Sequence, residues 1–312
     1  MAFYLVTGGG GFIGSNIVEE LLERGERVRV LDNFSTGRRE NLAPFLDKIE
    51  LIEGDLRSLS IVEEAVAGVD LILHQAALPS VPRSIRDPLA SHETNTRGTL
   101  NLLTAARDAK VKRVVYASSS SIYGDTPVLP KTEMMPPNPR SPYAVSKLAG
   151  EYYCRVFHSV YGLETVILRY FNIFGPRQDP SSQYSAVVPL FIKTMMTGGV
   201  PTIFGDGTQS RDFTFVANAV QANILAARAS DAAGKIFNIA CGKRYSLNDL
   251  VDKLNRILGT DIHPIYKDAR TGDVKHSQAD ISQAKRFLEY KPAIGFEDGL
   301  KQTVDWYKII NN

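Results

Sequence analysis

Residues 7–16 read TGGGGFIGSN and follow directly on a short apolar run, Phe3–Thr7. Two glycine spacings, GxxGxxG and GxGxxG, can be read through this stretch, and both pass through Gly11 and Gly14. Either spacing lets backbone N–H groups approach an anion at the start of the following helix, where the helix dipole favours negative charge. A strand, a glycine-rich turn and a helix in this order predict the first unit of a dinucleotide-binding parallel sheet.

An acidic residue ends the next apolar run, Val28–Asp32. In such sheets a carboxylate at this position binds the ribose hydroxyls of a dinucleotide and repels a 2′-phosphate. No arginine adjoins Asp32, which favours NAD over NADP, although Arg38 and Arg39 follow a few residues later. The sequence therefore predicts bound NAD.

Short apolar runs alternate with segments of helical periodicity up to about Asn172, and helices are expected at Ile17–Arg24 and Thr99–Ala109. Strands buried on both faces carry few polar residues, so the alternation predicts an α/β fold with a doubly wound parallel sheet of the Rossmann type. The expected strands are Phe3–Thr7, Val28–Asp32, Glu50–Glu53, Leu71–His74, Val114–Ala117 and Val166–Tyr170.

The pattern loosens after Asn172, where FGPRQDPSS introduces turns. We expect residues 1–172 to form the NAD-binding domain, with a return of the chain to it near 212–243, and residues 173–312 to form mainly a smaller mixed α/β substrate-binding domain. The elements expected there are helices at Ala186–Met196, Leu247–Leu258, Ser277–Phe287 and Leu300–Ile309, and strands at Thr202–Phe204, Phe213–Val216 and Ile236–Ala240.

Composition excludes several classes of protein. The 312 residues are 44% hydrophobic, and 36 Lys and Arg against 34 Asp and Glu give no reason to expect nucleic-acid or membrane binding. The N-terminus has no targeting pattern, and Cys154 and Cys241 lie in unrelated surroundings, as in a reducing compartment. We expect a cytoplasmic protein without a metal site, because no His, Cys or Asp cluster has metal-ligand spacing.

The stretch SPYAVSK, residues 141–147, places Tyr143 and Lys147 one helical turn apart on the same face. Lowering the pKa of a tyrosine from about 10 to about 7 requires roughly 4 kcal/mol, which one ammonium group about 4 Å away can supply. Upstream, the fifth strand runs into YASSSSIYG, residues 116–124, and a serine hydroxyl there can pass a proton between the phenol and a substrate. We therefore expect Lys147 to make Tyr143 acidic and a catalytic serine to lie nearby.

With these motifs the chain resembles the extended short-chain dehydrogenase/reductase family, in particular NAD-dependent UDP-sugar 4-epimerases of the UDP-glucose and UDP-N-acetylglucosamine type. The resemblance covers nearly the whole sequence. It is carried by TGGGGFIG, LDNFSTG, EGDL, HQAALPSVPRS, ETNTRGT, SSSSIYG, SPYAVSK, RYFNIFGPRQDP, GDGTQSRDF and RTGDVKHSQAD.

The resemblance implies Ser119, Tyr143 and Lys147 as the catalytic residues. Those implied to bind the cofactor, besides Tyr143 and Lys147, are Gly8, Gly11, Phe12, Ile13, Gly14, Asp32, Asn33, Ser35, Thr36, Gly37, Asp55, Leu56, Gln75, Ala76, Ala77, Asn95 and Tyr170. Those implied to bind the nucleotide sugar, besides Ser119 and Tyr143, are Ser80, Ser120, Asn172, Gln178, Ala186, Val187, Phe191, Thr202, Phe204, Arg211, Arg270, Asp273 and Ser277.

The implied reaction is reversible epimerisation at C4′ of a UDP-hexose through a 4-keto sugar, with NAD regenerated in each cycle and a homodimer as the expected assembly. Sugar 4,6-dehydratases and UDP-glucuronate decarboxylases carry carboxylates just after the catalytic hydroxyl, where this chain has Ser120 and Ser121. The small Ser277 is expected to admit an N-acetyl group, whereas Pro79 departs from the family pattern and could stiffen the sugar pocket. The sequence therefore leaves both N-acetylated and plain UDP-sugars as candidate substrates.

Four further alternatives remain. They are a UDP-glucuronate 4-epimerase, an NAD-dependent nucleotide-sugar dehydrogenase or reductase, an NADPH-dependent reductase, and a dinucleotide-sensing protein without activity. The last has no need of the Tyr143 and Lys147 pair, since a fold alone does not fix a function.

Overall fold

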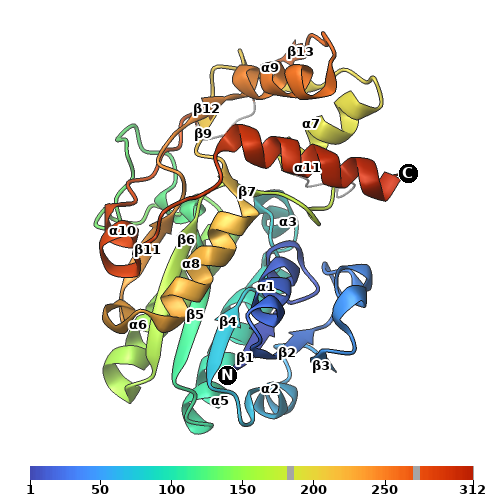
Figure 1. Ribbon diagram of the computed structural model, residues 1–312. Helices are drawn as coiled ribbons and strands as arrows, with labels where there is room; N and C mark the ends of the chain where they lie inside the picture. Colours follow the sequence, from blue (N-terminus) through green and yellow to red (C-terminus); the bar gives the residue numbers. More distant parts are fainter. Residues whose placement is uncertain (181–185, 270–274, 312) are drawn as a thin grey trace.

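The computed structural model describes residues 1–180, 186–269 and 275–311, and its centre is a seven-stranded parallel sheet (Figure 1). The strand order reverses between β1 and β4, which places a crevice at the carboxyl ends of these strands. The doubly wound α/β fold expected from the sequence is confirmed. From one edge to the other the strands are β11 (Ile236–Ile239), β6 (Glu164–Tyr170), β5 (Arg113–Ser119), β4 (Leu71–His74), β1 (Phe3–Thr7), β2 (Arg27–Asp32) and β3 (Ile49–Glu53).

Helices cover both faces of this sheet, because alternate side chains of each strand point to opposite faces. In β1, Tyr4 and Val6 enter one apolar cluster and Phe3 and Leu5 enter the other. Helices α1 (Phe12–Glu23) and α8 (Val216–Arg228) contribute to the first cluster, whereas α2 (Leu59–Val66), α5 (Gly98–Asp108) and α6 (Pro142–Tyr161) contribute to the second. None of the described helices is long and apolar enough to cross a bilayer.

The C-terminal part lies above the carboxyl ends of the strands (Figure 1). It contains three two-stranded pairs, β7 with β10, β9 with β12, and β8 with β13. Before that part is complete, the chain returns to the main sheet through α8 and β11, which pairs with β6. The bounds are β7 (Ile173–Phe174), α7 (Val187–Met196), β8 (Thr202–Phe204), β9 (Ser210–Arg211), β10 (Thr214–Phe215), β12 (Tyr245–Ser246), α9 (Leu247–Leu258), β13 (Ile265–Lys267), α10 (Ser282–Leu288) and α11 (Phe296–Asn311).

One helix begins later than the sequence predicts. Residues 277–281 were expected to open a helix at Ser277, but α10 begins at Ser282. The N–H of Ser277 donates instead to the carbonyl oxygen of Ser210, at 3.0 Å, and the N–H of Asp280 donates to that of Lys131, at 2.9 Å. These long-range bonds hold the segment extended, so the prediction for its first residues was wrong.

The turn between β1 and α1 depends on glycine because the backbone folds closely on itself. A Cβ atom at Gly14 would lie 2.1 Å from the carbonyl oxygen of Gly8, and one at Gly8 would lie 2.7 Å from the backbone of Ala76. Gly8 also has a φ of +70°, in the left-handed region. The turn therefore packs against both the first helix and the loop after β4.

We expect Gly14→Ala to lower the free energy of unfolding by roughly 1–3 kcal/mol, because the added methyl group meets backbone atoms that cannot move aside cheaply. Urea titration followed by circular dichroism measures this. Gly295→Ala is the matched control, since nothing lies within 4 Å of a Cβ atom at Gly295. Equal stability of the two variants would contradict the prediction.

Candidate functional site

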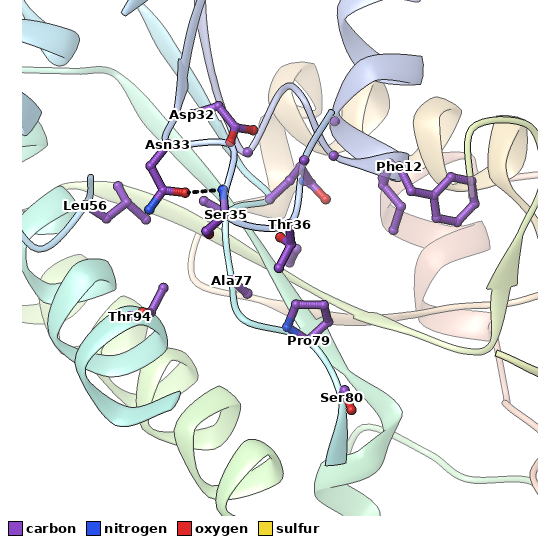
Figure 2. Close-up of a pocket in the computed structure, with 18 of the residues that line it drawn as sticks. Phe12, Asp32, Asn33, Ser35, Thr36, Leu56, Ala77, Pro79, Ser80 and Thr94 are labelled. Carbon is purple, nitrogen blue, oxygen red and sulfur yellow. Dashed lines mark hydrogen bonds between the residues drawn. The ribbon is translucent and has the colours of Figure 1, made fainter. Parts of the chain in front are cut away.

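A cavity of about 660 Å³ opens at the carboxyl ends of β1, β2, β4 and β5. Figure 2 shows one wall built from the loop after β2, with Asp32, Asn33 and Ser35, and another from the loop after β4, with Ala77, Pro79 and Ser80. All the residues expected to bind the cofactor line this cavity except Asn95. Of those expected to bind the sugar, it is lined by Ser80, Tyr143, Gln178 and Ala186.

The glycine turn presents the start of α1 to this cavity. Gly11 is the N-cap residue, has extended backbone angles, and makes no side-chain capping bond. The first N–H groups of a helix have no partner within it, so they can bind an anion together with the helix dipole. Phe12, Ile13 and Gly14, in the first turn of α1, also line the cavity. This arrangement fits the pyrophosphate of a dinucleotide.

Asp32, the last residue of β2, lies beside the same turn. Its carboxylate accepts hydrogen bonds from the N–H groups of Gly10 and Phe34, each at 2.8 Å. Burial raises the pKa of Asp32, and these backbone bonds oppose the increase. Each oxygen can accept a further bond, as a ribose diol requires. Asp32 thus fits the adenosine ribose of NAD.

The two nearby arginines are engaged elsewhere. The guanidinium of Arg38 forms an ion pair with Asp179 at 2.7 Å. That of Arg39 pairs with Glu53 and lies over the ring of Phe34. The ion pairs of both guanidiniums are thus with carboxylates other than Asp32.

Farther along this wall, Asn33 and Asp55 are joined by a hydrogen bond of 2.8 Å. Hydrogen bonds from the Arg57 guanidinium, which is 2.7 Å away, are the main cause that lowers the pKa of Asp55 to about 2. Asp55 is therefore ionised at neutral pH and orders the loop after β3. Leu56 and Gly54 line the cavity beside it.

Tyr143 and Lys147 project from the first two turns of α6. The helix begins cleanly because Ser141 caps it, accepting a bond from the N–H of Ala144, and Pro142 occupies its first position. The ammonium group of Lys147 donates to the carbonyl oxygen of Ala117, at 2.9 Å, which ties α6 to the end of β5. Both side chains line the cavity.

The electrostatics of this pair differ from the expectation. Burial raises the pKa of Tyr143, and a hydrogen bond with the Ser119 side chain opposes the increase only in part. Burial also lowers the pKa of Lys147, to about 8, although the nearby Cys154 and Glu151 oppose that shift. The protein groups alone therefore leave the pKa of Tyr143 above its ordinary value, because burial outweighs the hydrogen bond with Ser119.

A buried ion pair lies beneath these residues. Arg169 on β6 and Glu151 on α6 approach to 2.7 Å, and their side chains are 3% and 2% exposed. The hydroxyl of Ser118, which lines the cavity, donates to the same carboxylate. Arg169 also donates to the hydroxyl of Tyr123, at 2.9 Å. The end of β5 is thus fixed between β6 and α6 by charged groups.

The loop after β4 is fixed from behind. Asn95 accepts a bond from the N–H of Leu78 at 2.7 Å and donates to its carbonyl oxygen at 3.1 Å. Asn95 is buried and does not line the cavity. Ser80 has a φ of +98° and caps helix α3 (Val81–Arg86) through the N–H of Arg83. Asn95 therefore positions the cavity wall without forming it.

A second cavity of about 300 Å³ adjoins the first in the C-terminal part, and Ala186 lines both. It is bounded by α7, β7, β8 and β9. The side chain of Arg211 donates to the carbonyl oxygens of Ser210 and Lys275, at 3.0 and 3.1 Å. The predicted substrate residues that line this cavity are Asn172, Ala186, Val187, Phe191, Thr202, Phe204 and Arg211.

Some predicted residues lie elsewhere. Ser119, Ser120 and Ser277 line neither cavity, although the Ser119 side chain reaches Tyr143. Ser277 is buried, and Arg270 and Asp273 lie outside the described residues. Within the described part of the chain, no group of His, Cys, Asp or Glu side chains could hold a metal ion.

The sequence interpretation missed other lining residues. In the first cavity these are Leu31, Arg38, Gly54, Arg83, Thr94, Ala117, Ser118 and Asp179, and in the second Ile173, Phe174, Val188, Leu190, Gln209, Phe213 and Leu247. Several of them adjoin predicted residues, so their place in the chain was a usable signal. Asp179, which reaches the first cavity from the C-terminal side, follows the predicted Gln178 directly, whereas no predicted residue adjoins Arg83.

Asp212 connects segments that are far apart in the chain. It is fully buried, and its carboxylate accepts from the N–H groups of Cys241 and Gly242, each at 3.0 Å, and Ala279, at 3.2 Å. Its carbonyl oxygen accepts from the side chain of Asn172. Burial raises the pKa of Asp212 to about 7, although the backbone donors oppose this increase. One carboxyl group thus supports the wall from which Arg211 and Asn172 project.

Three comparisons place the chain among known proteins. Residues 4–240 match the model of the NAD dependent epimerase/dehydratase family. The chain is 37% identical to the UDP-glucose 4-epimerase of Mycolicibacterium smegmatis, over 97% of this chain and 98% of the other.

Two solved structures match the fold of this chain equally well, each with a TM-score of 0.95. One is the UDP-glucose 4-epimerase of Thermotoga maritima with UDP-glucose, at 37% identity, covering 99% of this chain and 100% of that one. The other is the UDP-N-acetylglucosamine 4-epimerase of Methanobrevibacter ruminantium M1 in complex with UDP-N-acetylmuramic acid, at 41% identity and 99% coverage of both chains.

The raised pKa of Asp212 predicts a specific dependence of stability on pH. Between its ordinary pKa of 3.8 and about 7, the folded protein keeps a proton that the unfolded chain has lost, so stability falls as pH rises through this window. Relative to Asp212→Asn, the wild type should lose roughly 2–4 kcal/mol of unfolding free energy between pH 4.5 and 8. Urea titrations at both pH values measure the difference.

Asp212→Asn has no titrating group at this position. Any pH-independent loss of unfolding free energy from its altered hydrogen bonds cancels when the change between the two pH values is compared with that of the wild type. A difference that stays constant or grows with pH would show that the backbone donors keep Asp212 ionised.

Proposed function

Because this chain belongs to the NAD dependent epimerase/dehydratase family, we propose that it interconverts the C4′ epimers of UDP-hexoses. The observation that carries this proposal is the junction of the two cavities at Ala186. Tyr143 and Lys147 lie in the first cavity, and Arg211 and Asn172 lie in the second. A nucleotide sugar bound in the second cavity can extend its hexose into the first.

The first cavity would hold NAD, with the start of α1 against the pyrophosphate and Asp32 against the adenosine ribose. When bound, NAD would supply a reversible acceptor for the C4′ hydride and, in its oxidised form, positive charge. Lys147, held by Ala117, would bind the nicotinamide ribose. The remaining predicted cofactor residues on the cavity wall, from Gly8 to Tyr170, would complete this site.

Tyr143 would take the proton from O4′ and later return it, with the Ser119 hydroxyl between the phenol and the sugar. Since burial raises the pKa of the phenol, its ionisation depends on positive charge from Lys147 and the bound cofactor together. Ser120, beside Ser119, would contact the sugar. Neither Ser120 nor Ser121 is a carboxylate, which disfavours dehydration and decarboxylation.

In the second cavity, Arg211 and Asn172 would bind the diphosphate of the substrate. The uracil would lie among Ala186, Val187, Phe191, Thr202 and Phe204. Arg270 and Asp273 are proposed from the sequence alone as diphosphate and ribose ligands.

The identity of the hexose rests on a few residues. Pro79, Ser80 and Gln178 all line the first cavity. Ser277 is buried and lines neither cavity, so its acceptance of an N-acetyl group is proposed from the sequence alone, and Pro79 would stiffen the loop after β4. We propose that UDP-N-acetylglucosamine and UDP-glucose are both substrates, with UDP-glucuronate as the alternative.

The purified protein, incubated without added NAD, should convert UDP-N-acetylglucosamine and UDP-glucose to their C4′ epimers, which chromatography resolves. Tyr143→Phe should lower the turnover number by roughly 10²- to 10⁴-fold, because the group that carries the proton is lost. Tyr161→Phe, on the exposed end of the same helix and outside both cavities, is the matched control.

If none of the three UDP-sugars reacts even with added NAD, the proposed function is wrong. Reaction of UDP-glucuronate alone would replace the proposed substrates by the alternative. Net production of NADH from a UDP-sugar would instead indicate a dehydrogenase.

We also propose that the protein is a homodimer that pairs through α6. Val145, Tyr152 and Val156 share one face of this helix and are 54%, 51% and 47% exposed. The neighbouring α3 and α4 (Pro88–His92), which pack on α6, expose Ile85 and Leu89. An apolar surface of this kind is typical of a protein interface.

Analytical ultracentrifugation should give the mass of a dimer for the wild type. Val156→Lys should weaken dimerisation at least about tenfold, because an unpaired ammonium group is costly to bury. Val200→Lys, at a similarly exposed position in the C-terminal part, should leave the mass unchanged. A monomeric wild type would refute the assembly without affecting the proposed reaction.

A further inference from the structure

A short loop between β7 and α7 reaches from the C-terminal part back to the first cavity. Within this loop, Gln178 and Asp179 line that cavity although β7 itself borders the second one. We call residues 176–179 the strap. The strap belongs to the C-terminal part of the chain. The other residues that line the first cavity, apart from Ala186, lie between Gly8 and Tyr170.

The strap is joined to the opposite wall by charge. Asp179 pairs with the guanidinium of Arg38 at 2.7 Å, and both residues line the cavity. Arg38 is also fixed through its backbone, since its N–H donates to the carbonyl oxygen of Gly10 at 2.9 Å. The ion pair therefore connects the strap to the glycine turn, where the pyrophosphate is proposed to bind.

Further contacts anchor the strap on helix α1. The side chain of Asn16 donates to the carbonyl oxygen of Pro176 at 3.2 Å. The guanidinium of Arg177 pairs with Glu19 at 2.9 Å and donates to the carbonyl oxygen of Ser15. Arg177 has a φ of +69°, a strained conformation for a residue with a side chain, and such strain persists only where surrounding contacts enforce it.

The strap also contacts helix α11, and it contains a buried side-chain oxygen without a hydrogen-bond partner among the described residues. The hydroxyl of Tyr307, on α11, donates to the carbonyl oxygen of Gln178. The side-chain oxygen of Gln178 is buried, and no donor among the described residues reaches it. A buried acceptor without a partner is unfavourable, so the Gln178 side chain gains a hydrogen bond if a donor approaches it from the adjoining cavity.

We propose that the strap, closed by the ion pair between Arg38 and Asp179, retains the dinucleotide between catalytic cycles. The proposal rests on the proposed placement of NAD in the first cavity. A ligand between the glycine turn and the strap would be held on both sides, and separation of these two walls breaks the ion pair. The pair is partly exposed, with side chains 50% and 34% accessible, so its effect on the rate of release is modest.

The test measures release of the cofactor directly. Protein loaded with radiolabelled NAD is mixed with excess unlabelled NAD, and the bound label is followed with time. Arg38→Gln and Asp179→Asn should each increase the release rate about two- to fivefold. The double variant should release NAD no faster than either single variant, because both remove the same interaction.

Arg39→Gln is the matched control. It breaks another exposed ion pair from the same loop, with Glu53, and neither residue lines the cavity. Its release rate should equal that of the wild type.

Unchanged release in both single variants would overturn the proposal. So would faster release in Arg38→Gln alone, because Arg38 would then act on the ligand directly, and so would additive effects in the double variant. The measurement contains no sugar, so a protein that fails to epimerise UDP-sugars can still confirm or refute the strap.

Discussion

The site depends on a carboxylate and a guanidinium that are withdrawn almost entirely from water. Glu151 and Arg169 are stable in the interior only because each satisfies the other and both make further hydrogen bonds. The pair joins α6 to β6, and through Ser118 it fixes the end of β5 as well. Lys147 lies one turn before Glu151 on the same helix, so the orientation of the proposed catalytic helix and that of the strand ends beneath it are set together.

In the C-terminal part, a buried carboxyl group again joins distant segments of the chain. Asp212 gathers backbone donors from segments about 30 and 70 residues away, and an aromatic cluster surrounds this junction. Within it, Phe213 and Phe296 stack with ring centroids 4.8 Å apart, and Phe174 meets Phe296 edge to face. The second cavity is therefore built from short strands that have little regular structure of their own, and long-range polar and aromatic contacts give them shape. Together with the strap, these contacts fix the position of the second cavity relative to the first.

Periodicity in the sequence predicted the sheet well because strands buried on both faces leave a continuous apolar signal. The bounds of β1, β4, β8 and α9 agree with the predicted ranges, and the glycine turn and Asp32 lie where their spacing placed them. Failures arose where distant parts of the chain decide the outcome. Residues 277–281 bond to Ser210 and Lys131 instead of forming a helical turn, and burial, which no motif encodes, raises the pKa of Tyr143 in the protein alone. The ion pair of Asp179 with Arg38 joins residues about 140 positions apart, which spacing along the chain alone does not reveal.

The position of β11 at one edge of the sheet has a consequence for biosynthesis. Its partner β6 ends at Tyr170, but β11 spans Ile236–Ile239, so more than sixty residues separate the two strands. While the chain emerges from the ribosome, β6 has a strand partner on one side only, and its other edge presents unpaired N–H and C=O groups. The main sheet thus cannot be completed until the chain has been synthesised to Ile239. Folding of the nascent chain is coupled across the whole protein, and a fragment that ends near residue 172 would retain an open strand edge prone to aggregation.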